Sequence, residues 1–180
     1  ALAFDRFGAL WVIDGVGQES RLVCFRSRGS DARWDQHTVI PTALGHQLEA
    51  IACWGDWLYL AGQGQVVRYR LEPSGLQGEA EVLVRGLPRS PIHLSATIWG
   101  LWLGTCGGEI VRPGHKALAL PRAASVWVCV PYDGAAPQLV AWETARWCGP
   151  PVADMRGRIH WLSVAPNGAL RGRVWDALTG

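Results

Sequence analysis

The histidines and serines are the residues best suited to acid–base, metal or nucleophilic chemistry, and their spacing points to none of these. A metal site on one strand or helix needs ligands a few residues apart, as in H-x-x-x-H, and no two histidines stand so close. The serines lack the G-x-S-x-G pattern of a nucleophile elbow. The sequence therefore predicts no catalytic residue, no metal ligand and no cofactor. The histidines are His37, His46, His93, His115 and His160.

Two glycine-rich stretches could in principle bind phosphate. They are GQGQ at 62–65 and GTCGG at 104–108. Phosphate binding of this kind uses the free amides at a helix N-terminus, and neither stretch precedes a helical pattern. Both are therefore interpreted as turns.

The tryptophans are a second class of candidate, because a flat exposed ring can stack on a sugar or anchor a protein partner. Five of the eleven lie inside apolar runs and are predicted to be core: Trp11, Trp57, Trp102, Trp127 and Trp161. Another five have polar or glycine neighbours, so that some of them are expected at the surface: Trp34, Trp54, Trp99, Trp142 and Trp147.

Four tryptophans are predicted as binding residues at an interface: Trp147, Trp34, Trp54 and Trp175. Trp147 is the best single candidate, because it lies in the loop-like stretch ETARWCGPP with an arginine beside it. Packing beneath that loop is the alternative explanation for this side chain.

Composition bounds the class of protein. The chain has 180 residues, 49% of them hydrophobic, which is enough for one domain with a sizeable core. The net charge is only +2 and no basic cluster occurs, which argues against nucleic acid as the main partner. No apolar run reaches the roughly 18 residues of a membrane-spanning helix, and no signal peptide is recognisable. A cytoplasmic location without membrane insertion is therefore expected.

The cysteines and the first residue add two expectations. The five cysteines include no C-x-x-C pair, and three of them lie in apolar runs, so free thiols are predicted, with one disulfide as the alternative. The chain begins at Ala1 and ends on Thr-Gly. We therefore expect it to be a piece or a subunit of something larger.

Short apolar runs between turn residues predict β-strands throughout. ALWVID and RLVCFR form one expected hairpin, WLYLAG and VVRYRLE a second, and LWLGTC with EIVR a third. No segment shows a sustained 3.6-residue period, so no helix is expected. Including two more, the predicted hairpins lie near 9–26, 56–72, 100–112, 126–142 and 159–175.

Repetition of these runs suggests an array. Glycines seven residues apart bracket a tryptophan-bearing run in GALWVIDG, GDWLYLAG and GLWLGTCG, and VWVCVPYDG is repeated as HWLSVAPNG. Repeats of roughly 35 to 50 residues in an all-β chain are typical of propeller blades, in which each glycine-bounded run would be an inner strand. The prediction is one all-β domain over 1–180, a β-propeller-like array of about four to five blades, complete or partial, with a β-sandwich as alternative. The predicted units lie near 1–30, 45–86, 90–121, 125–150 and 151–180.

Several stretches resemble known propeller repeats. LAFDRFGALWVIDGVGQESRLVCF resembles NHL-type and gluconolactonase-type repeats, and GLWLGTCGGEIVR is similar to repeats of sensor-kinase propellers. DMRGRIHWLSV and RVWDALTG resemble the ends of WD40 repeats, although the Gly-His pair of that family has no counterpart beyond Gly45-His46, which stands in no matching context. Together these resemblances imply the propeller fold without choosing a family.

The gluconolactonase resemblance would imply a central calcium ion held by carboxylate and amide oxygens. Asp133 and Asn167 are better explained by their turns, and Asp5 and Asp14 flank a strand, as in NHL repeats, where the acid ties the backbone. The available side chains are Asp14, Glu49, Asp56, Glu109, Asp133, Asp154 and Asn167.

The sequence favours a non-catalytic scaffold that mediates protein–protein interaction, with another protein or the remainder of a larger protein as partner. Two alternatives stay open: a tryptophan-rich carbohydrate-binding propeller and a calcium-dependent lactonase. An incomplete array leaves an end unit without a neighbour. The unit near Trp11, or the one near Trp161 and Trp175, is therefore expected to pack against another chain or the rest of the protein.

Overall fold

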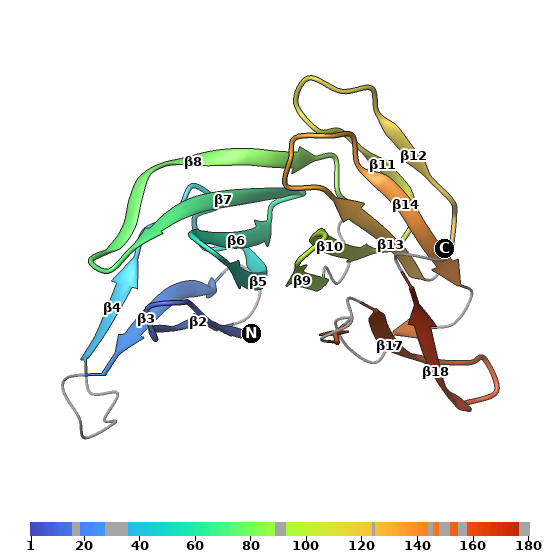
Figure 1. Cartoon of the computed structure of the whole chain (residues 1–180), viewed down its shortest axis with the longest axis horizontal. Helices are drawn as coiled ribbons and strands as arrows, with labels where there is room; N and C mark the ends of the chain where they lie inside the picture. The colour runs from blue at the N-terminus through green and yellow to red at the C-terminus, as the bar shows by residue number, and fades with distance from the viewer. Residues whose placement is uncertain are drawn as a thin grey trace. The chain divides into compact units, whose positions relative to one another are not determined.

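The protein is built of β-strands. The computed structural model describes residues 1–15, 19–27, 36–88, 93–123, 125–143, 146–147, 152–154 and 158–176. In these ranges every regular element longer than a turn is a strand, so the all-β prediction is confirmed. The chain divides into two compact units, Ala1–Arg85 and Gly86–Gly180 (Figure 1). No helix in the described ranges is long and apolar enough to cross a membrane.

The first unit begins with a four-stranded antiparallel sheet in which each strand pairs with the next along the chain. Its central strands, β2 and β3, carry apolar side chains on both faces of the sheet. Trp11, Ile13, Leu22 and Cys24 point to the buried side and belong to the core cluster. The strands are β1 (Leu2–Phe4), β2 (Leu10–Asp14), β3 (Arg21–Arg26) and β4 (Gln36–Ile40).

A buried carboxylate fixes the turn between β1 and β2. Asp5 is 8% exposed, and its Oδ1 accepts hydrogen bonds from the amides of Phe7 (2.8 Å) and Ala9 (2.9 Å). Its Oδ2 accepts one from the indole Nε1 of Trp11 at 2.8 Å. One side chain thus ties the turn to the central tryptophan of the next strand, as the NHL resemblance implied for the acid before the glycine.

The second sheet of this unit repeats the same order with β5 (Leu48–Trp54), β6 (Trp57–Gly62), β7 (Gln65–Glu72) and β8 (Gly75–Arg85). Its buried side chains Ile51, Leu58, Leu60, Val67 and Tyr69 join those of the β1–β4 sheet in one apolar cluster. The two sheets therefore pack against each other through one face each.

The second unit contains a sheet with the order β14-β13-β10-β9. It combines strands from two predicted repeat units, so the units near 90–121 and 125–150 share one sheet. The strands are β9 (His93–Thr97), β10 (Gly100–Thr105), β13 (Ser125–Val130) and β14 (Gln138–Glu143).

The third predicted hairpin, near 100–112, is wrong. β10 pairs with β9 and β13, whereas β11 (Gly108–Ile110) pairs with β12 (Leu118–Leu120) in a separate two-stranded sheet. Two glycines with positive φ explain the difference, because Gly107 (φ 43°) and Gly108 (φ 104°) turn the chain away from the sheet. The edge of β10 that was predicted to pair with β11 pairs with β13 instead.

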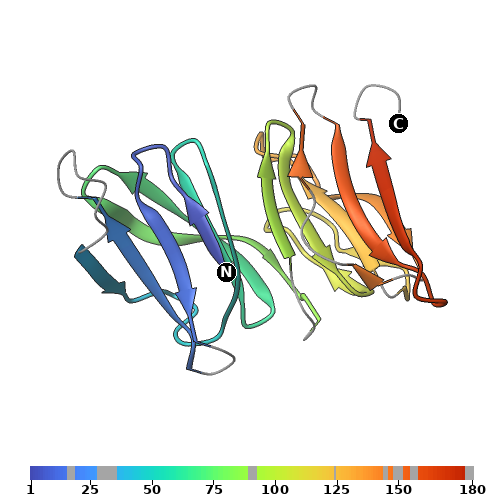
Figure 2. The same cartoon turned by 90° about the horizontal axis from the view of Figure 1, so that it is seen from below.

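The last sheet is centred on β17 (Ile159–Val164), which pairs with β18 (Leu170–Trp175) along one edge. Two short strands share its other edge, β15 (Arg146–Trp147) and β16 (Val152–Ala153). Figure 2 shows the β17–β18 hairpin in orange and red. Ile159, Trp161 and Trp175 pack on Trp102 and Trp127 of the β9–β14 sheet in a second apolar cluster.

Two hairpin turns of this unit have the chemistry expected from their sequences. In VPYDG, the Asp133 carboxylate accepts a hydrogen bond from the Ala135 amide at 2.9 Å; in APNG, the Asn167 amide oxygen accepts one from the Ala169 amide at 3.1 Å. The glycine that follows has φ 90° at Gly134 and 81° at Gly168. The predicted hairpins near 126–142 and 159–175 are therefore confirmed.

The three glycine-bounded tryptophan runs occupy equivalent places. β2, β6 and β10 are each an interior strand of a four-stranded antiparallel sheet, second from one edge (Figure 1). Trp11 and Trp102 are fully buried. These runs are thus the central strands around which the sheets are organised.

Candidate functional site

The four tryptophans predicted as interface residues do not form one site. Trp34 lies outside the described residues. The backbone of Trp147 lies in β15, where it pairs with Ser163 of β17, and its side chain is outside the described part of the chain. For these two positions the interface prediction stays a prediction.

Trp54 and Trp175 are described and differ from each other. Trp54 ends β5 in the first unit and is 40% exposed, as its polar neighbours predicted. Trp175 ends β18 in the second unit and stacks edge-to-face on Trp102, with ring centroids 5.1 Å apart. Its half-buried ring thus packs against the core cluster of that unit.

The acids considered as calcium ligands are dispersed over different strands and turns, and three of them pair with arginine. Asp14 pairs with Arg21, Asp56 with Arg6, and Asp154 with Arg158, each at 2.7 Å. Within the described ranges no group of three or more His, Cys, Asp or Glu side chains is placed to hold a metal ion. The arrangement of these residues therefore offers no support for the lactonase alternative.

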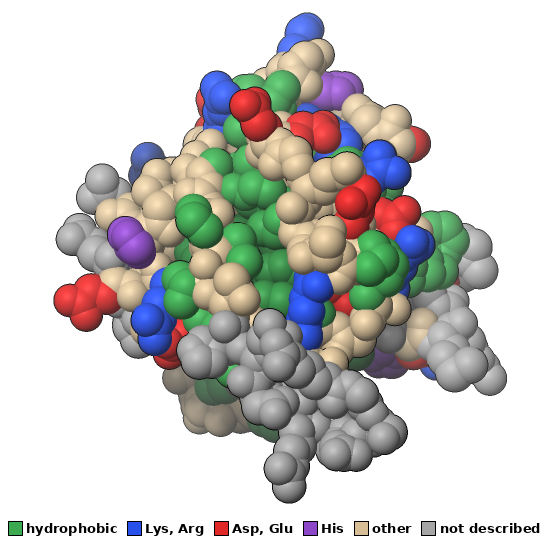
Figure 3. All heavy atoms as spheres, turned by 90° about the vertical axis from the view of Figure 1, so that its left-hand side faces the viewer, with side chains coloured by type: hydrophobic (Ala, Val, Ile, Leu, Met, Phe, Trp, Pro, Cys, Tyr) green, Lys and Arg blue, Asp and Glu red, His purple; other side chains and the backbone are tan. Residues whose placement is uncertain are grey.

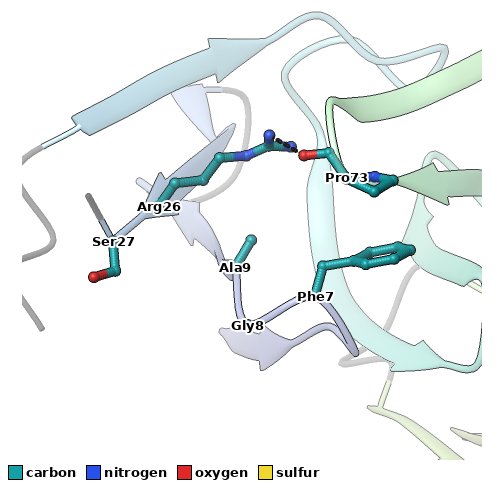
Figure 4. A pocket seen from close by; sticks show the side chains of 6 residues that line it. All are labelled: Phe7, Gly8, Ala9, Arg26, Ser27 and Pro73. Carbon is teal, nitrogen blue, oxygen red and sulfur yellow. Dashed lines mark hydrogen bonds between the residues drawn. The ribbon is translucent and has the colours of Figure 1, made fainter. Parts of the chain in front are cut away.

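A small pocket lies in the first unit, where the β1–β2 turn, the end of β3 and the β7–β8 turn meet. Figure 4 shows Arg26 reaching toward Pro73, to whose carbonyl it donates a hydrogen bond, with the Phe7 ring below. The cavity has a volume of about 230 Å³, below the roughly 300–1,000 Å³ of typical ligand sites. Its lining pairs no nucleophile with a base: Phe7, Gly8, Ala9, Arg26, Ser27 and Pro73.

The described cysteines are free thiols, and two of them are strongly perturbed. Burial raises the pKa of Cys53 from 9.0 to about 12 and that of Cys129 from 9.0 to about 11. A thiol must ionise to act as a nucleophile, so neither is suited to catalysis. Their place in apolar strands indicates a packing role.

This burial predicts slow alkylation. At pH 8, iodoacetamide should modify Cys53 and Cys129 at least about tenfold more slowly than Cys106, because so little thiolate is present. Timed labelling and peptide mass spectrometry would measure the rates, with labelling in denaturant as the control that should equalise them. Equal rates in the native protein would contradict the burial of Cys53.

The same thiols set the sign of a pH effect. A pKa raised in the folded state means that the native protein keeps a proton that the unfolded chain has lost. The free energy of unfolding should therefore be unaffected by the ionisation of Cys53 below pH 9.0. It should fall as the pH rises from 9.0 toward about 12. Replacing Cys53 with alanine should flatten that part of the profile.

The most distinctive exposed surface of the second unit is the outer face of its last sheet. Four large apolar side chains, which we call the β16–β18 surface, lie there: Val152 (64% exposed), Leu162 (48%), Leu170 (63%) and Val174 (57%). Strand register places them together, because His160 lies between Val152 and Val174, and Leu162 faces Gly172 beside Leu170. Soluble proteins seldom expose a contiguous apolar area without a partner.

A polar network reaches into this surface through His160, which lies between Val152 and Val174. The Oδ2 of Asp154 accepts hydrogen bonds from Arg158 Nε at 2.8 Å, and His160 Nε2 lies 3.0 Å from the same oxygen. The Arg158 amide donates to Oδ1 at 2.9 Å, which ties the end of β16 to the start of β17. Protein interfaces usually combine apolar side chains with polar groups of this kind.

The sequence predicted that an end unit, near Trp11 or near Trp161 and Trp175, packs against a partner. It did not single out these four side chains, although β17 carried a signal. In IHWLSV, Ile159 and Trp161 alternate with Leu162 and Val164, so that both faces of β17 are apolar. A strand with one solvated face shows a polar residue at every second position. Apolar residues on both faces are typical of a strand that is covered on both sides.

Comparison with protein-family models and with curated proteins gives no match for this chain.

Proposed function

We propose that the chain is a non-catalytic binding scaffold, a propeller-like array of short-stranded sheets whose β16–β18 surface docks another protein. The observation that carries this proposal is the set of four exposed apolar side chains on one sheet face, with His160 of the Asp154 network between two of them. Within the second unit the opposite face of the same sheet already packs on Trp102 and Trp127. One apolar face of this sheet is covered by the β9–β14 sheet, so the other is available to a partner protein.

The propeller-like arrangement is part of this proposal. Three observations support it: the β1–β4 and β5–β8 sheets are four-stranded meanders, three glycine-bounded runs occupy the same interior position, and sheets pack face to face within each unit. Blades of a propeller bury their faces in this way.

A photo-cross-linking experiment tests the docking surface. With benzoylphenylalanine at Leu162, irradiation of cells that make the protein should give discrete protein adducts, because this side chain lies within the surface. The same group at Pro166, in the exposed β17–β18 turn, is the matched control and should give few. Adding Leu170→Arg should reduce the adducts at Leu162 at least about tenfold, since a buried unpaired charge opposes association.

Two outcomes would count against the proposal. One is equal labelling from the two positions, which would indicate random collision. The other is adduct formation at Leu162 that Leu170→Arg leaves unchanged, because the two side chains lie on one surface.

A further inference from the structure

The first unit has an exposed apolar face of its own, on the side of the β1–β4 sheet away from its core. Register places Leu2, Val12, Val23 and Val39 in one row across the sheet, and Phe4, Leu10 and Phe25 in the next. On the edge strands Leu2 is 64% exposed, Phe4 58% and Val39 47%, whereas Val23 in the middle of the sheet is 4% exposed. We call these seven residues the β1–β4 outer face.

This face is separate from the core of the unit. The alternate residues of the same strands, Trp11, Ile13, Leu22 and Cys24, are the ones that pack on the β5–β8 sheet. On the side where β3 and β4 lie, Figure 3 shows hydrophobic side chains gathered in the middle and charged ones mostly around them. The sheet therefore has two apolar sides, one covered by the β5–β8 sheet and one exposed along the edge strands β1 and β4.

The charges on this face cancel locally. Among its described side chains only Asp14 and Arg21 are charged; they face each other in register, with Arg21 Nε and a terminal nitrogen 2.9 and 2.7 Å from Asp14 Oδ2. In a two-fold contact the same patch of each molecule meets its copy, so uncompensated charge would repel itself. A neutral ion pair beside seven apolar residues has no such penalty.

We infer that the β1–β4 outer face is a self-association surface, on which a second copy of this chain packs sheet to sheet about a two-fold axis. This surface is distinct from the β16–β18 surface, so the inference stands or falls independently of the proposed function.

The size of the face indicates a weak, reversible dimer. Four strands about 4.8 Å apart and about five residues long present a sheet face of roughly 300 Å². Stable complexes bury about 800 Å² on each partner, so dissociation constants of about 10 µM to 1 mM are expected.

Analytical ultracentrifugation of the whole chain tests the inference. The weight-average mass should rise from that of one chain toward that of two across this concentration range. Leu2→Asp and Val39→Asp should each weaken the dimer at least about tenfold, because both place an unpaired charge in the contact. Ile98→Asp, at an exposed apolar position of the second unit, is the matched control and should leave it unchanged; thermal melts monitored by circular dichroism establish that each variant is folded.

A charge reversal gives a second, independent readout. Asp14→Arg leaves like charges on both copies and should weaken association at least about fivefold at low salt, while adding Arg21→Asp should restore it. A chain that stays monomeric up to about 1 mM overturns the inference. So does a dimer that survives Leu2→Asp and Val39→Asp, or one that Leu170→Asp also abolishes, since the contact would then involve the second unit.

Discussion

Asp5→Ala should lower the free energy of unfolding of the first unit by about 4 kcal/mol, one of the two largest effects expected of a single substitution here. Three donors lose their acceptor at once, the amides of Phe7 and Ala9 and the indole nitrogen of Trp11. Two of these hydrogen bonds are buried, so water does not readily replace the carboxylate. Urea denaturation followed by circular dichroism would measure the loss.

Asparagine at this position distinguishes the hydrogen bonds to the two backbone amides from the one to the Trp11 indole. Asp5→Asn keeps an oxygen for the two amides and places an amide donor against the Trp11 donor, so a loss of about 2 kcal/mol is expected. In a Trp11→Phe background that clash is absent and the further cost of Asp5→Asn should shrink. Asp14→Ala is the control, because its ion pair with Arg21 is more than half exposed and should cost at most about 1 kcal/mol. Equal costs for Asp5→Ala and Asp14→Ala would contradict the structural role of Asp5.

Gly62→Ala should be about as damaging, for a steric reason. A Cβ on Gly62, the last residue of β6, would lie 1.9 Å from the carbonyl oxygen of Gln47 and 3.3 Å from the Cα of Leu48. Both contacts are with backbone atoms, so the start of β5 must move. We expect a loss of about 3 kcal/mol or more, seen as a fall in Tm of about 10 °C or more for a unit of this size.

Gly172 provides the matched control for Gly62. It also lies in a strand, β18, and a Cβ there would meet only Leu162 Cδ2, at 4.0 Å. Gly172→Ala should leave Tm unchanged or raise it slightly, because alanine lowers the entropy of the unfolded chain. A similar fall in Tm for both variants would show that strand propensity, and not the Gln47 contact, determines the cost.

The parts of the fold predicted from sequence were those determined by neighbouring residues. The hairpins β2–β3, β6–β7, β13–β14 and β17–β18 each join adjacent runs through a short connection or turn, and all four were predicted. The pairing of β10 with β13 was not, because its partner residues Leu101 and Val130 are far apart in sequence and the intervening β11–β12 hairpin resembles a local partner. Which edge a strand uses depends on tertiary packing that no local pattern encodes.

Candidate sites were harder to predict for the same reason. Trp175 was predicted as an interface residue, yet its ring packs on Trp102, which is distant in sequence. The exposed side chains that matter, such as Leu162 and Leu170, look like ordinary core residues in the sequence. Only the arrangement of the sheet distinguishes them from Ile159, which is fully buried.

The apolar character of both faces of β17 has a consequence for the fidelity of folding. In most sheets a slip of one residue between strands exposes the core set and is strongly disfavoured. Here a slip would exchange Trp161 for Leu162, one apolar side chain for another, so hydrophobicity alone discriminates poorly between the two alignments. The bonds of the β17–β18 turn, from the Ala169 amide to Asn167 at 3.1 Å and from the Gly168 amide to the Ala165 carbonyl at 2.8 Å, must then select the native alignment. The five-residue connection 165–169 thus determines the alignment of a whole strand pair.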